Sequence, residues 1–231
     1  MPTISTPPPR TAVADIRPWQ RPFKTGIALT AAVFVLGYAT ITPWVTTLDL
    51  HLDQGLAAGR NATLTTIAEL ATTVAQPAVG AAATVLIPLL LVLRHRIGLG
   101  LRVAALIGAS LALALVAKVI IAEDRPPAAL AVVAPDPGWG YPSGHATVAA
   151  ALAAALILLS PTGTWRRLAI VVGLTFAGLV GWSRLYLGVH YPPDILGSYL
   201  TVTAVALLAY AAWQHPLARY LPGGKTRVVD R

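Results

Sequence analysis

LRVAALIGASLALALVAKVII, at residues 101–121, decides the fold of this chain. Nearly every residue in it is apolar, and its two charged side chains, Arg102 and Lys118, lie near the two ends. A helix needs ~20 mostly apolar residues to cross the hydrocarbon layer of a bilayer. The stretch therefore predicts a membrane-spanning helix.

Further apolar stretches on both sides predict more such helices, although those that begin at residues 146 and 168 are short. They lie at residues 25–45, 74–93, 146–159, 168–182 and 195–213. The chain is 56% hydrophobic and 11% charged, whereas a soluble domain is about 25% charged. We therefore predict an all-α integral membrane protein with six transmembrane helices.

The remaining segments complete the predicted organisation. Residues 49–73 carry charges and apolar residues at mixed helical spacing, so we expect an interfacial helical segment between helices one and two. Residues 1–20 are expected to be a disordered cytoplasmic tail, 21–214 the six-helix domain and 215–231 a basic cytoplasmic tail. The first apolar run is long enough to span, which argues against a signal peptide.

The formal net charge of +8 has a topological explanation. If the N-terminus is cytoplasmic and six helices alternate, 13 of the 17 Lys and Arg residues fall on the inside, as the positive-inside rule requires. This placement in short loops argues against nucleic-acid binding. The chain has no cysteine, which excludes disulfides and thiolate sites.

Four basic residues fall on the predicted outer side, and three of them lie at or just beyond helix ends. These three are Lys118, Arg125 and Arg184, and the fourth is Arg60. Charges at or inside a bilayer are costly and commonly functional. Three cations at one membrane face indicate that an anion binds between them.

The first two cations belong to the segment KVIIAEDRP at residues 118–126. Lys118 and Arg125 are nearly two helical turns apart and project to the same side, and Pro126 favours the end of the helix there. The guanidinium group of arginine can donate hydrogen bonds to two phosphate oxygens at once, and lysine adds a localised positive charge. Alternatively, Lys118 extends to the lipid headgroups and Arg125 pairs with Glu123 or Asp124.

The second element is PSGH at residues 142–145, which opens the fourth predicted helix. Ser143 is suited to cap that helix, and the free N–H groups of a first turn bind phosphate. Gly144 would allow an anion to approach the backbone closely, with His145 beside it. The alternative is a capped helix with a surface histidine.

The third element is SRLYLGVHYPPD at residues 183–194. Arg184 is a candidate third phosphate ligand. Asp194 lies close enough to His190 in sequence to accept from one imidazole nitrogen, which would make the other nitrogen a better nucleophile. Alternatively, the histidine caps a helix or faces the headgroups.

Together these elements resemble the three-part signature of the type 2 phosphatidic acid phosphatase family. The matching segments are Lys118-x6-Arg125-Pro126, Pro142-Ser143-Gly144-His145 and Ser183-Arg184-x5-His190-x3-Asp194. They occur in the family's order and cover about a third of the chain. Vanadium haloperoxidases and bacterial acid phosphatases carry the same signature, but these relatives are soluble, and six apolar spans argue against them.

The resemblance implies a role for each signature residue. His190 attacks phosphorus to form a phosphohistidine, Asp194 orients His190, and His145 protonates the leaving oxygen and then activates water. The phosphoryl oxygens are held by Lys118, Arg125, Ser143, the Gly144 amide and Arg184. No metal or cofactor is required, although Glu123, Asp124 and Asp136 leave magnesium open as an alternative.

The expected substrate is an amphiphilic phosphorylated lipid, cleaved at the non-cytoplasmic face of a cell membrane. Phosphatidic acid, phosphatidylglycerophosphate, diacylglycerol pyrophosphate and prenyl mono- or diphosphates are the candidates from the family. A lipid-linked phosphotransferase and a transporter that holds phosphate without cleaving it are the rival functions. The sequence leaves the oligomeric state open.

Overall fold

The computed structural model describes residues 17–220, and within that range it is helical with no β-strand. The predictions for residues 1–16 and 221–231 fall outside the described residues. The prediction of an all-α protein is confirmed. Its α-helices are α1 (Gln20–Thr40), α2 (Pro43–Ala58), α3 (Ala62–Thr73), α4 (Pro77–Leu93), α5 (Ile97–Ile121), α6 (Gly144–Leu159), α7 (Thr164–Tyr186) and α8 (Pro192–Gln214).

Five helical stretches are long and apolar enough to cross a membrane: Gln20–Thr40, Ala62–Leu93, Ile97–Ile121, Thr164–Tyr186 and Pro192–Gln214. The second combines α3 and α4. Helix α6 is apolar but shorter, with 16 residues. It packs against α4, α5, α7 and α8, and this central place explains why it is apolar all round.

Prolines open three of the helices, α2, α4 and α8, and so account for several differences from the predicted boundaries. Helix α1 ends at Thr40 rather than at residue 45, because Thr42 is extended and Pro43 opens α2. The segment expected as one interfacial stretch contains most of α2 and all of α3, which are separated by residues 59–61. Asn61 caps α3 by accepting a hydrogen bond from the Leu64 amide at 3.0 Å.

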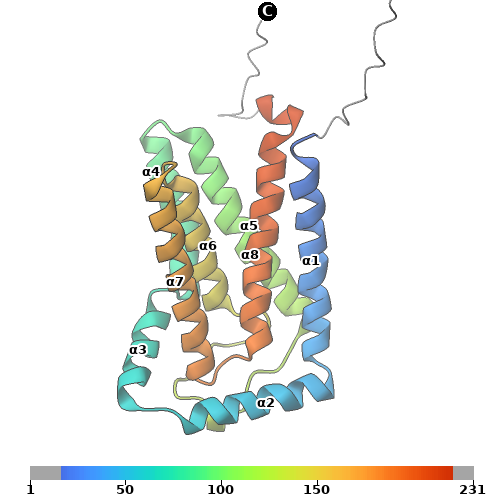
Figure 1. Cartoon of the computed structure of the whole chain (residues 1–231), viewed down its shortest axis with the longest axis vertical. Helices are drawn as coiled ribbons and strands as arrows, with labels where there is room; N and C mark the ends of the chain where they lie inside the picture. The colour runs from blue at the N-terminus through green and yellow to red at the C-terminus, as the bar shows by residue number, and fades with distance from the viewer. Residues whose placement is uncertain (1–16, 221–231) are drawn as a thin grey trace, which may run out of the picture.

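Figure 1 shows α1 and α4–α8 running roughly along the long axis, while α2 lies across one end. We call this end the α2 end. At the opposite end, called the terminal end, α1 begins and α8 finishes. The loop from α5 to α6 and the short connection from α7 to α8 both lie at the α2 end (Figure 1).

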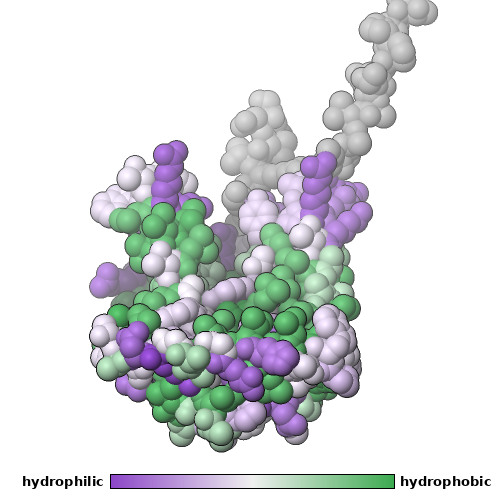
Figure 2. Space-filling model, turned by 60° about the horizontal axis from the view of Figure 1, so that its bottom comes forward, coloured by the Kyte–Doolittle hydropathy of each residue, from purple (hydrophilic) through white to green (hydrophobic). Residues whose placement is uncertain are grey.

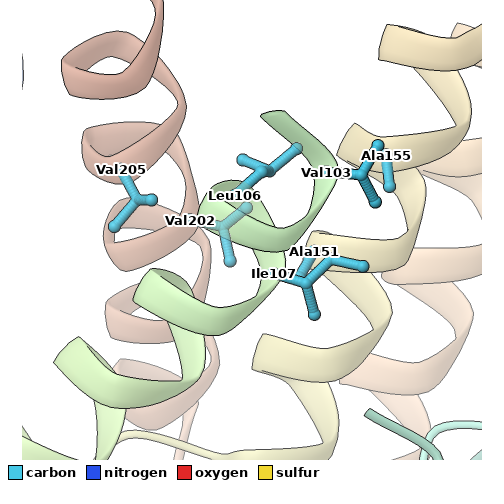
Figure 3. Close-up of a cluster of buried hydrophobic side chains, with 7 residues drawn as sticks. All are labelled: Val103, Leu106, Ile107, Ala151, Ala155, Val202 and Val205. Atoms are coloured by element: carbon cyan, nitrogen blue, oxygen red, sulfur yellow. The ribbon is translucent and has the colours of Figure 1, made fainter. Parts of the chain in front are cut away.

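The interior is packed by small and branched side chains from three helices. Figure 3 shows one buried cluster, made of Val103, Leu106, Ile107, Ala151, Ala155, Val202 and Val205 from α5, α6 and α8. Small residues such as alanine let membrane helices approach closely.

Large apolar side chains on the outside face away from this interior. On α4 and α7, Leu86, Leu90, Val171 and Leu174 are each more than half exposed. Figure 2 shows hydrophilic side chains at both ends of the molecule, with apolar side chains between them. This is the surface that a bilayer requires.

Candidate active site

The three signature segments meet at the α2 end. The first covers the last turn of α5 and the residues after it, the second opens α6, and the third joins α7 to α8. The amide of Ser143 donates to the carbonyl of Asp194 at 3.2 Å, and the hydroxyl of Ser198 donates to the carbonyl of Ser143 at 2.9 Å. These bonds hold the beginnings of α6 and α8 side by side.

Tyr141 anchors the loop that leads into α6. Its ring is fully buried, and its hydroxyl donates to the carbonyl of Val33 in α1 at 2.5 Å. Gly197 in α8 faces the Tyr141 side chain so closely that a Cβ there would lie 2.5 Å from two ring carbons and from the hydroxyl oxygen. The segment before Ser143 is therefore fixed between α1 and α8.

His190 and Asp194 form a buried pair, as their spacing predicted. His190 Nδ1 lies 2.9 Å from Asp194 Oδ2, and both side chains are fully buried. The same carboxylate oxygen accepts from the Tyr191 amide at 3.0 Å. Because Asp194 lies in the first turn of α8, its position is set by the helix start as well as by the imidazole.

The contacts of His190 define which nitrogen carries the proton. The carboxylate of Asp194 accepts from Nδ1–H, so Nε2 carries the lone pair. Arg125 Nη1, which can only donate, lies 3.1 Å from this Nε2. These contacts fit a neutral imidazole with its proton on Nδ1 and its Nε2 facing the guanidinium of Arg125.

Carbonyl oxygens from neighbouring segments hold the first two cations. Arg125 donates to the carbonyls of Gly138 and Val189 at 3.0 and 3.1 Å, and within residues 17–220 it forms no ion pair with Glu123 or Asp124. Lys118 donates to the carbonyls of Trp139 and Gly140 at 2.6 and 3.0 Å. Lys118 therefore bends over the loop rather than extending to lipid headgroups.

Arg184 and His145 meet at a carboxylate that the motifs do not contain. Asp136 Oδ2 lies 2.9 Å from Arg184 Nη2 and 3.4 Å from His145 Nδ1. Arg184 also donates to the hydroxyl of Thr72 in α3 at 2.8 Å. Arg184 and His145 are buried, whereas Asp136 is 38% exposed.

Ser143 and Gly144 form the beginning of α6. The Ser143 hydroxyl accepts from the Ala146 amide at 3.4 Å, as expected for an N-cap. A Cβ on Gly144 would meet only Pro77 Cγ, at 3.5 Å, so the protein itself does not require glycine there. Close approach of an anion remains a prediction.

Burial and four charged or ionisable side chains of the signature affect the pKa of His190. Burial lowers the pKa of His190 well below 6.5, and the charges of Arg125, Arg184, Lys118 and His145 add to this effect. Charges influence a titrating group in this way only at short range. Contacts support the same grouping: Arg125 touches His190, Arg184 and His145 share Asp136, and Lys118 is held by the loop that carries Asp136. The two histidines and the three cations therefore lie at one end of the bundle.

Sequence reasoning missed three contacts in this region. Glu123 is buried and lies beside Asp194. The two carboxyl groups are neighbours, since a Cβ built on Gly140 would lie 3.3 Å from Glu123 Oε2 and 3.5 Å from Asp194 Oδ2. Asp136 and Thr72 contact Arg184. The sequence offers no spacing signal for Thr72, and Asp136 was considered only as a magnesium ligand. In the described range, no three His, Cys, Asp or Glu side chains are grouped to hold a metal ion.

The chain is similar to several known proteins. The family model described as the PAP2 superfamily matches residues 99–217, more than half of the 231 residues. An undecaprenyl-diphosphatase of Sulfolobus acidocaldarius is 31% identical over 126 residues, which cover 52% of this chain and 58% of that protein. The human sphingosine-1-phosphate phosphatase 2 is 38% identical over 78 residues, which cover 32% of this chain and 19% of that protein. The matched part is thus less than two thirds of either relative.

The fold has a counterpart among solved structures. A transmembrane PAP2-type phosphatidylglycerolphosphate phosphatase from Bacillus subtilis superposes with a TM-score of 0.70 at 23% sequence identity. The superposition covers 81% of this chain and 95% of that one. At this identity the likeness concerns the helical fold.

Proposed function

Because this chain belongs to the PAP2 superfamily, as its motifs predicted, we propose that it hydrolyses phosphate from a lipid phosphate or lipid pyrophosphate. The observation that carries this proposal is the position of His190 between Asp194 and Arg125. Its Nδ1 faces Asp194 at 2.9 Å, and its Nε2 lone pair faces the cationic group of Arg125. A neutral, oriented imidazole beside three cations is suited to attack a phosphoryl group.

In the first step, His190 Nε2 forms a bond to phosphorus while the bond from phosphorus to the lipid-side oxygen breaks. His145 gives its proton to that oxygen, so the lipid leaves as an alcohol or, from a pyrophosphate, as a lipid monophosphate. His145 then takes a proton from water. The water oxygen bonds to phosphorus, and the N–P bond breaks to release inorganic phosphate and neutral His190.

Two cations would change partners when the substrate binds. Attack requires the lone pair that Arg125 now contacts, so Arg125 turns from Nε2 to the phosphoryl oxygens. Arg184 shares its guanidinium between Asp136 and the phosphate. Lys118 adds a third positive charge, Ser143 and the Gly144 amide donate from the start of α6, and no metal ion is needed to balance the anion.

We further propose that all six apolar stretches cross the membrane and that α2 lies at the interface. Helix α6 extends about 24 Å, less than the ~30 Å of the hydrocarbon layer, so the phosphate site at its start would be recessed beneath α2. The distribution of basic residues supports cytoplasmic termini and an active site on the other face. Here the site would meet headgroups of the outer leaflet.

The test is phosphate release by the purified protein from a panel of lipid mono- and diphosphates in detergent, with His190→Ala as the blank. We expect release that persists in EDTA, that vanadate blocks and that the His190→Ala variant lacks. Equal release from the variant, or complete loss in EDTA, would refute the proposed mechanism. Transfer of the phosphoryl group to an added alcohol instead of water would indicate a phosphotransferase.

A further inference from the structure

A cavity of about 540 Å³ lies at the terminal end of the bundle, remote from the candidate active site. Helices α5, α6 and α8 form most of its wall. Leu106, which contributes to the buried cluster of Figure 3, also lines the cavity. Tyr210 in the wall is 54% exposed, so the cavity opens on the surface.

The wall of the cavity is apolar along most of its length. Small residues in this wall leave the space open. Alanines of α6 and α8 stand where larger side chains would fill the cavity, and leucines complete the lining: Leu99, Leu106, Ala154, Leu158, Ala206 and Ala209. The volume falls within the 300–1,000 Å³ typical of ligand sites. Such a wall favours a hydrocarbon chain.

The polar lining of the same cavity is mainly cationic and aromatic, with the amide of Gln214 beside it. Arg102 from the second turn of α5 and Arg166 from the first turn of α7 both line it, together with Trp213 near the end of α8. The guanidinium of Arg102 lies 5.6 Å from the centre of the Trp213 ring. Arg166 donates from Nη2 to the Ser160 carbonyl at 3.0 Å, and its buried Nε has no hydrogen-bond partner in the described structure.

Charge is distributed very unevenly along the bundle. Within residues 17–220, every acidic side chain belongs to α2, α3, the loop between α5 and α6, or the first turn of α8. The terminal end instead carries Arg17, Arg21, Lys24, Arg94, Arg96, Arg102, Arg166 and Arg167. This end is complementary to an anion.

We propose that this cavity binds an anionic phospholipid, with an acyl chain along α6 and α8 and the phosphodiester headgroup at Arg102 and Arg166. Arginine forks bind phosphate oxygens in pairs, and basic pockets between membrane helices recognise anionic headgroups. Trp213 and Tyr210 lie near the C-terminal end of α8 and line the cavity with the two arginines, and aromatic rings are enriched beside lipid headgroups. A free phosphate ion would leave the apolar wall unused.

The lipid site is separate from the proposed phosphatase site. Arg102 and Lys118 lie 16 residues apart on the same helix, about 24 Å along its axis. A phosphodiester lipid such as phosphatidylglycerol also lacks the terminal phosphate that the proposed reaction removes. Binding at this cavity can therefore be measured without any enzymatic readout.

The experiment compares phosphatidylglycerol and phosphatidylcholine of identical acyl chains on the purified full chain in detergent, with retained lipid counted by native mass spectrometry. Arg166→Gln removes a cavity cation, and Arg167→Gln removes the neighbouring exposed one as the matched control. Ala209→Leu narrows the apolar wall without changing charge. Lipid held at the phosphatase site is common to all variants and cancels in the comparison.

We expect the wild-type protein to retain phosphatidylglycerol in preference to phosphatidylcholine. Arg166→Gln should weaken phosphatidylglycerol binding about fivefold, the usual effect of one basic residue on an anionic lipid. Ala209→Leu should also weaken binding, whereas Arg167→Gln should leave it unchanged. Equal retention of both lipids, equal losses in Arg166→Gln and Arg167→Gln, or displacement by glycerol phosphate alone would each overturn the proposal.

Discussion

Nε2 of His190 lies 3.1 Å from Nη1 of Arg125, while Nδ1 of the same ring faces the buried carboxylate of Asp194. The imidazole is therefore held between an acceptor on one side and a donor on the other, in a single tautomer. In the proposed reaction, Arg125 protects and directs the lone pair until a phosphoryl group takes its place.

Replacing Asp194 with Asn tests whether the tautomer matters. The amide keeps the shape of the carboxylate, but its NH₂ group can donate to Nδ1 and so favour the proton on Nε2. We expect kcat to fall about 10²–10⁴-fold, as for other oriented imidazoles, with vanadate binding retained. A variant that keeps more than a tenth of wild-type kcat would show that Asp194 does not set the tautomer.

The pH dependence of kcat/KM tests the environment of His190. Burial and the neighbouring cations lower the pKa of His190, and the nucleophile is the neutral form, present above that pKa. Activity should therefore persist as pH falls through 6.5 and decline only at lower pH. Two substrates whose phosphate groups have different pKa values show whether the loss of kcat/KM at low pH comes from the enzyme or from the substrate. A loss at or above pH 6.5 that is the same for both substrates would contradict this prediction.

Asp136→Asn tests whether the carboxylate that bridges Arg184 and His145 competes with phosphate. Removing the negative charge frees Arg184 for an anion. Because Asp136 is 38% exposed, its ion pair is worth about 0.2–1 kcal/mol. We expect the inhibition constant for vanadate to fall by up to about fivefold.

Asp124→Asn is the matched control for that measurement, since it removes the same charge from an exposed position of the same loop. The control should bind vanadate as the wild type does. If Asp136→Asn binds vanadate more weakly than the control, Asp136 supports the phosphate site instead of competing for it.

The contact between Gly197 and Tyr141 predicts opposite effects of two Gly→Ala substitutions. A Cβ at Gly197 would collide with the buried Tyr141 ring, whereas a Cβ at Gly178 in α7 would meet nothing within 4 Å. Gly197→Ala should cost about 1–3 kcal/mol through overpacking. Gly178→Ala should stabilise by about 0.5–1 kcal/mol through helix propensity. Thermal unfolding in detergent measures both, and equal midpoints would show that Tyr141 yields without cost.

The sequence by itself determined the helices and the family signature. An apolar run of about 20 residues must be a helix in lipid, because every backbone N–H and C=O group must be satisfied within it. The four-residue spacing from His190 to Asp194 made their contact possible, and the structure shows that it forms because the short turn between them enters α8.

Contacts between distant segments were decided by the tertiary structure alone. Arg184 and Asp136 are 48 residues apart, and whether they meet depends on the path of the loop between α5 and α6. The cavity between α5, α6 and α8 likewise depends on how three helices diverge at the terminal end. Local sequence pattern reports the average environment of a segment, whereas such contacts arise only when packing fixes the relative positions of several segments at once.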